Sequence, residues 1–222
     1  MGKRGPKPKR LVSEKWRPEL AYAIGLLASD GCLAKNVTLV DLTSKDREQL
    51  GNFCRCIGVD LRIGEKSSGF GQKDNFRVQL KNVFFYNFLL SVGLTPAKSK
   101  TLGALRVPRK YFFDFLRGVF DGDGSTYSYW DKRWRSSFMF YVCFASASPD
   151  FIQWLQETIH SHLQIRGHVT GAKGHSTGQL KYGKSDGLKI LKRMYAAPDK
   201  SVLLSRKYLK IQRMLSIVGE RL

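Results

Sequence analysis

The sequence predicts an α+β fold built from two similar halves. Segments 18–31 and 108–124 share one pattern: a proline, a run of apolar and small residues, and an Asp-Gly pair at the end. When Asp30 is aligned with Asp123, at an offset of 123 − 30 = 93 positions, the glycines five residues before and one residue after each aspartate also align. The same order of strand-like and helix-like patterns follows each segment. This internal repeat indicates two pseudo-symmetric αββαββα half-domains.

Composition and turn residues divide the chain of 222 residues into five parts. Residues 1–17 are basic, contain two prolines and lack periodicity, so we expect an N-terminal arm that lies along a phosphate backbone or stays solvated. The first half-domain is predicted at 18–93 and the second at 108–200. Residues 94–107 form a short linker, which favours packing of the halves against each other. Residues 201–222 add a C-terminal amphipathic helix.

The first half begins with a helix, because proline suits the first helical turn and small residues at Ala21, Gly25 and Ala28 share one face. Such a face allows a second helix to approach closely. The helix ends at Asp-Gly. Alternating apolar and polar residues then predict strands, and longer periodic runs that end at glycine predict helices. The expected strands are 32–33, 37–43, 61–66 and 76–81, and the expected helices end at 57 and 92.

The second half repeats this order. A second apolar helix runs up to Asp123 and carries Gly118 at its middle. The same patterns follow it in the same sequence, which is the main reason to expect two equivalent halves. The predicted strands lie near 125–129, 137–145, 165–170 and 179–182, and the predicted helices at 149–163, 186–195 and 201–217.

Net charge points to a polyanionic partner. Lys and Arg number 38 against 18 acidic residues, a formal net charge of +20. The basic residues are spread along the chain, so they predict a broad nucleic-acid surface on a folded protein rather than a basic tail. No apolar run approaches the roughly 18 residues of a membrane span, and no secretory signal is expected at the N-terminus. We therefore expect no membrane partner.

The four cysteines do not suggest a disulfide framework. Cys32, Cys54, Cys56 and Cys143 are irregularly spaced and form no CxxC pair. Buried free thiols in a reducing compartment are the simplest expectation. A zinc site at Cys54 and Cys56 stays open as an alternative, although the histidines are far away in sequence.

The two helix-ending segments carry a family resemblance. AIGLLASDG at 23–31 and LRGVFDGDG at 116–124 resemble the two LAGLIDADG motifs of single-chain homing endonucleases. The first motif departs at Ala28, where an acidic residue is common, but both keep the final aspartate. The resemblance implies that the motif helices pack together. It also implies that each half forms a four-stranded antiparallel sheet, and that the sheets make a DNA-binding saddle in the major groove.

The resemblance implies a function as well. Such a protein is a site-specific endonuclease that cuts both strands of a long, asymmetric double-stranded DNA target and acts as a monomer. The expected cofactor is Mg²⁺, with Mn²⁺ able to substitute and Ca²⁺ bound without supporting cleavage. The expected location is a reducing compartment that holds the host genome. Two alternatives on the same fold stay open, an RNA maturase that assists splicing and a DNA-binding regulator that does not cleave.

The predicted metal ligands are Asp30 and Asp123. Hydrolysis of a phosphodiester requires charge neutralisation, an activated water and a stabilised leaving oxygen, which carboxylate-held divalent metals supply. The backbone carbonyls of Ser29 and Gly122 are candidate additional ligands. A single Asp-Gly pair would more simply end a helix, whereas two at matched positions favour a shared metal site.

Three lysines are candidate catalytic groups. Lys81 ends a predicted strand where the family commonly has a catalytic lysine, and Lys184 is its counterpart in the second half. Lys45 follows the strand end at Ser44 and also resembles a family active-site position. For all three the alternative role is a phosphate contact.

The strands also predict a DNA-contacting surface. In 76–81 apolar residues alternate with Arg77, Gln79 and Lys81, so one face can pack on helices while the other carries donors for base edges and phosphates. An ordinary solvated sheet face would also be polar, and the +20 charge favours the DNA interpretation. The predicted DNA-binding residues are Arg62, Lys66, Arg77, Gln79, Arg166, His168 and Lys181.

Overall fold

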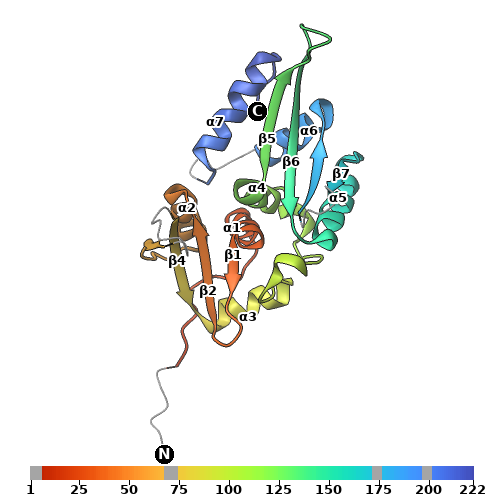
Figure 1. Cartoon of the computed structure of the whole chain (residues 1–222). Coiled ribbons are helices and arrows are strands. Elements are labelled where there is room, and N and C mark those ends of the chain that lie inside the picture. Colours follow the sequence, from red (N-terminus) through yellow and green to blue (C-terminus); the bar gives the residue numbers. More distant parts are fainter. Residues whose placement is uncertain (1–6, 68–74, 172–176, 197–201) are drawn as a thin grey trace, which may run out of the picture.

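The computed structural model describes residues 7–67, 75–171, 177–196 and 202–222. Two halves with the same order of elements lie on either side of a central pair of helices (Figure 1). The α+β class and the two pseudo-symmetric halves predicted from the repeat are confirmed, although the part boundaries remain predictions.

The first half contains three helices and four strands. In chain order they are α1 (Pro18–Ser29), β1 (Gly31–Leu33), β2 (Leu39–Ser44), α2 (Arg47–Ile57), β3 (Gly64–Lys66), β4 (Asn75–Lys81) and α3 (Val83–Val92).

The second half follows two short 3-10 turns, η1 (Lys98–Lys100) and η2 (Arg109–Tyr111), and the chain ends with an additional helix. In chain order the elements are α4 (Phe112–Asp123), β5 (Ser125–Trp130), β6 (Phe138–Ser146), α5 (Pro149–Leu163), β7 (His168–Gly171), β8 (Gly178–Tyr182), α6 (Lys184–Met194) and α7 (Ser205–Ile217).

Each half forms one four-stranded antiparallel sheet. The strand orders are β1-β2-β4-β3 and β5-β6-β8-β7, so the two sheets share one topology. Strand alternation buries one face of each sheet. In β4, Val78 and Leu80 are buried while Gln79 is exposed. We call the face of each sheet opposite these buried side chains its open face.

The halves meet where α1 and α4 pack side by side (Figure 1). Gly25 and Gly118 face each other at the crossing. A Cβ atom added to Gly25 would lie 2.8 Å from the backbone nitrogen of Val119, and one added to Gly118 would lie 3.0 Å from that of Leu26. Only glycine allows this approach, which fulfils the expectation drawn from the small residues of the helix face.

Part of the predicted arm is packed rather than free. Val12 is buried, the ring of Trp16 contacts Phe88 with centroids 5.8 Å apart, and Asn82 donates a hydrogen bond of 2.8 Å to the carbonyl of Lys9. Trp16 finds a surface on α3, which composition alone did not reveal, whereas Leu11 stays exposed. Residues 1–6 of the predicted arm lie outside the described residues.

The expectation that the four cysteines are buried free thiols holds for only some of them. All four cysteines are free, and Cys56 and Cys143 are buried, but Cys32 is exposed because it points to the open face of β1. Within the described ranges no group of three or more His, Cys, Asp and Glu side chains could hold a metal, so the zinc alternative gains no support. Among the described helices, none combines the length and apolar character needed to cross a bilayer.

Candidate active site

The two motif aspartates lie together at the end of the central helix pair. Asp30 caps the C-terminus of α1 and Asp123 is the last residue of α4. A Cβ atom added to Gly122 would lie 2.9 Å from Oδ2 of Asp30, so the Asp30 carboxylate rests against the residue that precedes Asp123. The first strand of each sheet, β1 or β5, starts just after the aspartate of its own half, which places the pair between the two sheets.

The two carboxylates are in an electrostatically unfavourable arrangement. Burial, with the negative charge of Asp123, raises the pKa of Asp30 to about 6, against the opposing effects of Gln49, Lys207 and Lys98. Burial also raises the pKa of Asp123, while Lys98 and Lys207 oppose the rise. Two neighbouring, partly desolvated carboxylates with raised pKa values are typical of functional sites.

Asp30 is oriented by a side chain that the sequence did not suggest. Gln49 is buried on α2 and its Nε2 donates a hydrogen bond of 2.8 Å to Oδ2 of Asp30. The hydroxyl of Ser44 in turn donates to Oε1 of Gln49 at 2.9 Å. Within the described part of the chain, no hydrogen bond reaches the carboxylate of Asp123. The two aspartates are therefore held differently.

Two buried lysines lie beneath the aspartates. Nζ of Lys98 donates to the carbonyls of Ala28 at 2.8 Å and Ser29 at 3.3 Å. Nζ of Lys207, from α7, lies at the C-terminus of α4, where cations are favoured at helix ends. It donates to the carbonyls of Phe120, Asp121, Gly122 and Gly124 at 2.6, 2.8, 2.9 and 2.7 Å.

The two lysines differ in what they can still contact. An ammonium carries three N–H donors. Lys207 has four carbonyl acceptors, so its donors are used up and it holds the backbone around Gly122. Lys98 has two carbonyl acceptors among the described residues and lines a small pocket together with Ser29 and Asp123. Burial lowers the pKa of Lys207 to about 8 and also lowers the pKa of Lys98.

These contacts bear on the predicted backbone ligands. The carbonyl of Ser29 already accepts from Lys98, and that of Gly122 from Lys207. A carbonyl oxygen has a second lone pair, so each of these carbonyls can also bind a metal and would then share its oxygen with an ammonium. Both remain proposals.

The structure does not bring Lys81 and Lys184 to the aspartates. Gly31, next to Asp30, lies level with Val78 across the sheet, and Lys81 lies three residues farther along β4, about 10 Å away. Lys184 donates to the carbonyl of Phe138, at the end of β6 remote from Asp123. The physical reason is strand direction, because β4 and β8 begin at the aspartate end and run away from it. The catalytic roles of Lys81 and Lys184 gain no support from these positions and remain predictions.

Lys45 does lie at the aspartate end. It is exposed and directly follows Ser44, the residue that contacts Gln49. Its catalytic role remains a proposal.

The first sheet carries most of its predicted DNA contacts on the open face. Lys66, Arg77 and Gln79 share that face through their register with β2. Arg62 does not lie on a strand, because β3 begins only at Gly64, later than expected. It is exposed in the preceding loop, and its placement on a sheet face is therefore corrected.

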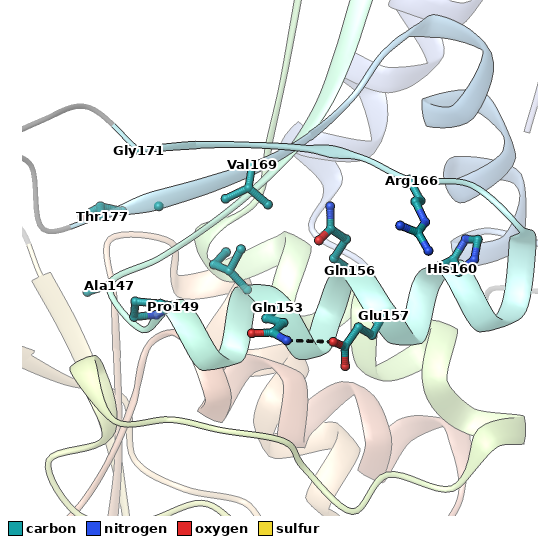
Figure 2. Close-up of a pocket in the computed structure, with 12 residues that line it drawn as sticks. Ala147, Pro149, Gln153, Gln156, Glu157, His160, Arg166, Val169, Gly171 and Thr177 are labelled. Atoms are coloured by element: carbon teal, nitrogen blue, oxygen red, sulfur yellow. Dashed lines mark hydrogen bonds between the residues drawn. The ribbon is translucent and has the colours of Figure 1, made fainter.

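The second sheet carries two of its three predicted contacts on the open face. His168 pairs with Lys181, and Lys181 pairs with Cys143. Arg166 precedes β7 and instead lines a hollow of about 640 Å³ between α5 and β7, next to His160 (Figure 2). Because β7 starts only after Arg166, this side chain turns toward α5, which corrects its assignment to the strand face.

Sequence reasoning missed a tyrosine cluster on the second open face. Tyr127, Tyr129 and Tyr141 stack with ring planes 9–12° apart and centroids 4.9–6.4 Å apart. Tyr127 and Tyr129 are each 43% exposed. The two open faces thus have different chemistry.

The acidic residue missing from the first motif has a structural role in the second. Asp121, the counterpart of Ala28, is fully buried and accepts hydrogen bonds from the hydroxyl of Tyr22 at 2.7 Å and the backbone nitrogen of Leu204 at 3.0 Å. Burial raises its pKa to about 6. It ties α1 and the start of the C-terminal segment to α4 rather than facing the aspartate pair.

Solved structures of other proteins share this fold, although no protein-family model matches the sequence and no curated protein does either. LAGLIDADG meganuclease I-AabMI bound to uncleaved DNA aligns with TM-score 0.62 and 13% identity over 90% of both chains. Homing endonuclease I-WcaI bound to its DNA recognition sequence aligns with TM-score 0.61 and 11% identity over 91% of this chain and 88% of that one. The chain has the LAGLIDADG fold.

This fold is not restricted to proteins named as endonucleases. The N-terminal LAGLIDADG domain of DUF199/WhiA is also similar, with TM-score 0.54 and 13% identity over 90% of this chain and 88% of that one. At such identities the comparisons show the fold alone. The LAGLIDADG resemblance of the two motifs is supported by this fold, with α1 and α4 as the motif helices.

The residues present fit a divalent cation, which the fold family implies. Asp30 and Asp123 offer hard carboxylate oxygens, and the repulsion between them is what a divalent cation would relieve. The protein supplies few ligands, so phosphate and water oxygens would complete the coordination, as is usual for Mg²⁺. A similar structure, I-DmoI, is described in complex with DNA and Mn.

The raised pKa of Asp30 has a consequence for stability that can be measured. A carboxyl with a folded pKa of about 6 and an ordinary value of 3.8 stabilises the fold below pH 3.8, and this stabilisation is lost as pH rises through 6. We expect Asp30→Asn, in EDTA, to stabilise the protein by about 1–2 kcal/mol at pH 8, allowing for partial exposure, and to have little effect at pH 4. Urea unfolding at both pH values measures this, and equal effects at the two would contradict it.

Proposed function

We propose that the protein is a site-specific, metal-dependent DNA endonuclease that acts as a monomer and cuts both strands of an asymmetric duplex. The observation that carries the proposal is the meeting of Asp30 and Asp123 at the ends of paired helices, between two sheets with polar or aromatic open faces. Each half would contact one half of the target, and the aspartates would lie beneath the phosphates at its centre.

The chain's own residues account for positioning and charge. Asp30 and Asp123 would hold the divalent cations, which supply charge neutralisation and an activated water when bound. Gln49 fixes one carboxylate. Lys98 lines the pocket beside Asp123 and would donate to a phosphate oxygen there, and Lys207 holds the backbone next to Asp123. Because Asp30 and Asp123 are held differently, we expect the two strands to be cut at unequal rates.

Two other functions on this fold are weaker candidates. A DNA-binding regulator would require the basic open faces but neither carboxylate. An RNA maturase would require an RNA surface, and a nuclease centre would be dispensable. The adjacent aspartates cost stability when ionised, so their presence at both matched positions favours the nuclease.

The proposal is tested with a randomised DNA library. The protein is incubated with the library in Mg²⁺ and, in parallel, in Ca²⁺, and the cut ends are sequenced. We expect cleavage at one long sequence in Mg²⁺, and binding without cleavage in Ca²⁺. Sequence-specific binding with no cleavage in Mg²⁺ or Mn²⁺ would favour the regulator, and preference for RNA over DNA would favour the maturase.

Binding to DNA should depend strongly on salt. With several phosphates contacted, affinity should fall about 10³-fold or more between roughly 50 and 200 mM salt. Arg77→Gln should reduce the slope of log affinity against log salt by about 1. Tyr127→Phe is the matched neutral variant on the other open face and should leave the slope unchanged. Fluorescence anisotropy over a salt series measures all three, and a flat response of the wild type would contradict binding through these faces.

A further inference from the structure

An acidic side chain lies in the middle of the first open face. Asp41 is on the central strand β2, level with Cys32 on β1 and Gln79 on β4. Its side chain is 16% exposed. In a chain of net charge +20, a carboxylate on the face proposed to meet DNA repels phosphates and weakens binding. We therefore expect Asp41 to have a role that offsets this loss of affinity for DNA.

The contacts of Asp41 connect it to predicted DNA-binding residues. Oδ2 accepts a hydrogen bond of 2.8 Å from Nε2 of Gln79, and Oδ1 accepts one of 2.9 Å from Oγ1 of Thr43. Nζ of Lys66 lies 3.9 Å from Oδ1 of Asp41 and donates to Oγ1 of Thr43 at 3.0 Å. Asp41, Thr43, Lys66 and Gln79 thus form one connected set, the Asp41 network. Its carboxylate is largely covered by the other members.

The chemistry of the carboxylate decides which way the Gln79 amide faces. An ionised carboxylate only accepts hydrogen bonds, so the NH₂ side of the amide must face Asp41. Oε1 and the second N–H of Gln79 are left for a partner outside the protein. A glutamine amide recognises adenine in the major groove by accepting from N6 and donating to N7. Such recognition needs one defined orientation of the amide, since the flipped amide exchanges donor and acceptor.

We propose that Asp41 is a positioning residue for sequence discrimination, which fixes the amide of Gln79 so that Gln79 recognises an adenine in the target. This inference rests on the proposed function, in that the ligand of the open face is duplex DNA. The matching position in the second sheet carries Cys143, level with Ser125 and Lys181. The Asp41–Gln79 contact would therefore act on only one half of the target. In this proposal Asp41 lowers the general affinity for DNA and raises discrimination at one base pair.

The test replaces the carboxylate without changing its shape. In Asp41→Asn the new amide can donate or accept, so Gln79 can adopt both orientations, and one negative charge leaves the DNA face. Sequences bound by each protein from a randomised duplex library in Ca²⁺ are compared, together with affinity for a random duplex. We expect the preference for A·T at one base pair to fall at least about fivefold, while affinity for random DNA rises.

Matched variants separate positioning from charge and from direct contact. Asp60→Asn removes the same charge from an exposed loop residue and should leave base preference unchanged. Gln79→Ala should lose preference at the same base pair as Asp41→Asn, and the double variant should lose no more than Gln79→Ala alone. Melting temperature confirms that each variant is folded, and a merely structural role would lower it without altering base preference.

The outcomes are distinguishable. Unchanged base preference in Asp41→Asn overturns the inference and leaves the proposed function intact. A further loss of preference when Asp41→Asn is added to Gln79→Ala also overturns it, because Asp41 would then contact a base itself. If the wild type selects no sequence at all, the proposed function fails and the inference fails with it.

Discussion

Replacing either motif aspartate by asparagine should abolish double-strand cleavage and leave DNA binding largely intact. In Asp30→Asn or Asp123→Asn the side chain keeps its shape but loses the charge that would hold a divalent cation against the phosphates. Loss of outer metal-site partners already costs about 10–100-fold, so we expect a loss of more than about a hundredfold here. The measurement is conversion of a supercoiled plasmid carrying the selected target into linear product in Mg²⁺, with binding measured in Ca²⁺.

Asp60→Asn serves as the control, since it removes one negative charge from an exposed loop. It should cleave at the wild-type rate. A plasmid assay also resolves nicked circles, which would show that one aspartate still serves its own strand. Normal linearisation by either motif variant would contradict the assignment of the metal ligands.

The glycine contact between the motif helices should be the most sensitive point of the fold. A side chain at Gly118 would meet the backbone of α1, with its Cβ 3.0 Å from the nitrogen of Leu26, so the helices would have to separate. Overpacking in a core typically costs about 1–3 kcal/mol, and rigid backbone on both sides places Gly118→Val at or above about 3 kcal/mol. Denaturant unfolding measures the change. Because the same helices carry Asp30 and Asp123, cleavage should also be lost.

Gly51 supplies the matched control. It lies within α2, and a Cβ atom added there would meet nothing within 4 Å. Alanine in a helix interior is favoured over glycine by about 1 kcal/mol, so Gly51→Ala should stabilise the protein by about 0.5–1 kcal/mol. Tolerance of Gly118→Val with wild-type stability would mean that the helices do not cross at these glycines.

The repeat in the sequence predicted most of the fold because both halves had to satisfy the same local rules. Apolar periodicity, glycines at helix ends and the matched spacing of the two motifs predicted where each helix and strand lies, but not where each one begins and ends. Several edges differed by a few residues: β3, β7 and α7 begin at Gly64, His168 and Ser205, later than expected. β3 and β7 are edge strands, and each pairs with only one neighbouring strand. The apolar–polar alternation in the sequence therefore covers more residues than the hydrogen-bonded pairing that defines each strand. Arg62 and Arg166 were misplaced for this reason.

The aspartate pair could be predicted, whereas the groups that support it could not. Lys98 contacts a carbonyl 70 residues away, and Lys207 one 85 residues away. No local period links such positions, and neither the linker pattern nor the amphipathic pattern of the final helix indicates a contact with the motif helices. One signal was present: Pro-x-Lys-Ser occurs at 96–99 and again at 198–201. The second copy lies outside the described residues, and it does not include Lys207. Strand direction also places Lys81 and Lys184 away from the aspartates.

The most direct measurement is anomalous scattering from Mn²⁺ in crystals of the protein bound to its selected duplex. If Asp30 and Asp123 together form the metal centre, the peaks will lie about 2.1 Å from carboxylate oxygens of both residues and in contact with the phosphates of the two strands. Bound duplex with no Mn²⁺ peak at either carboxylate, or with the peaks on other residues, would contradict the account.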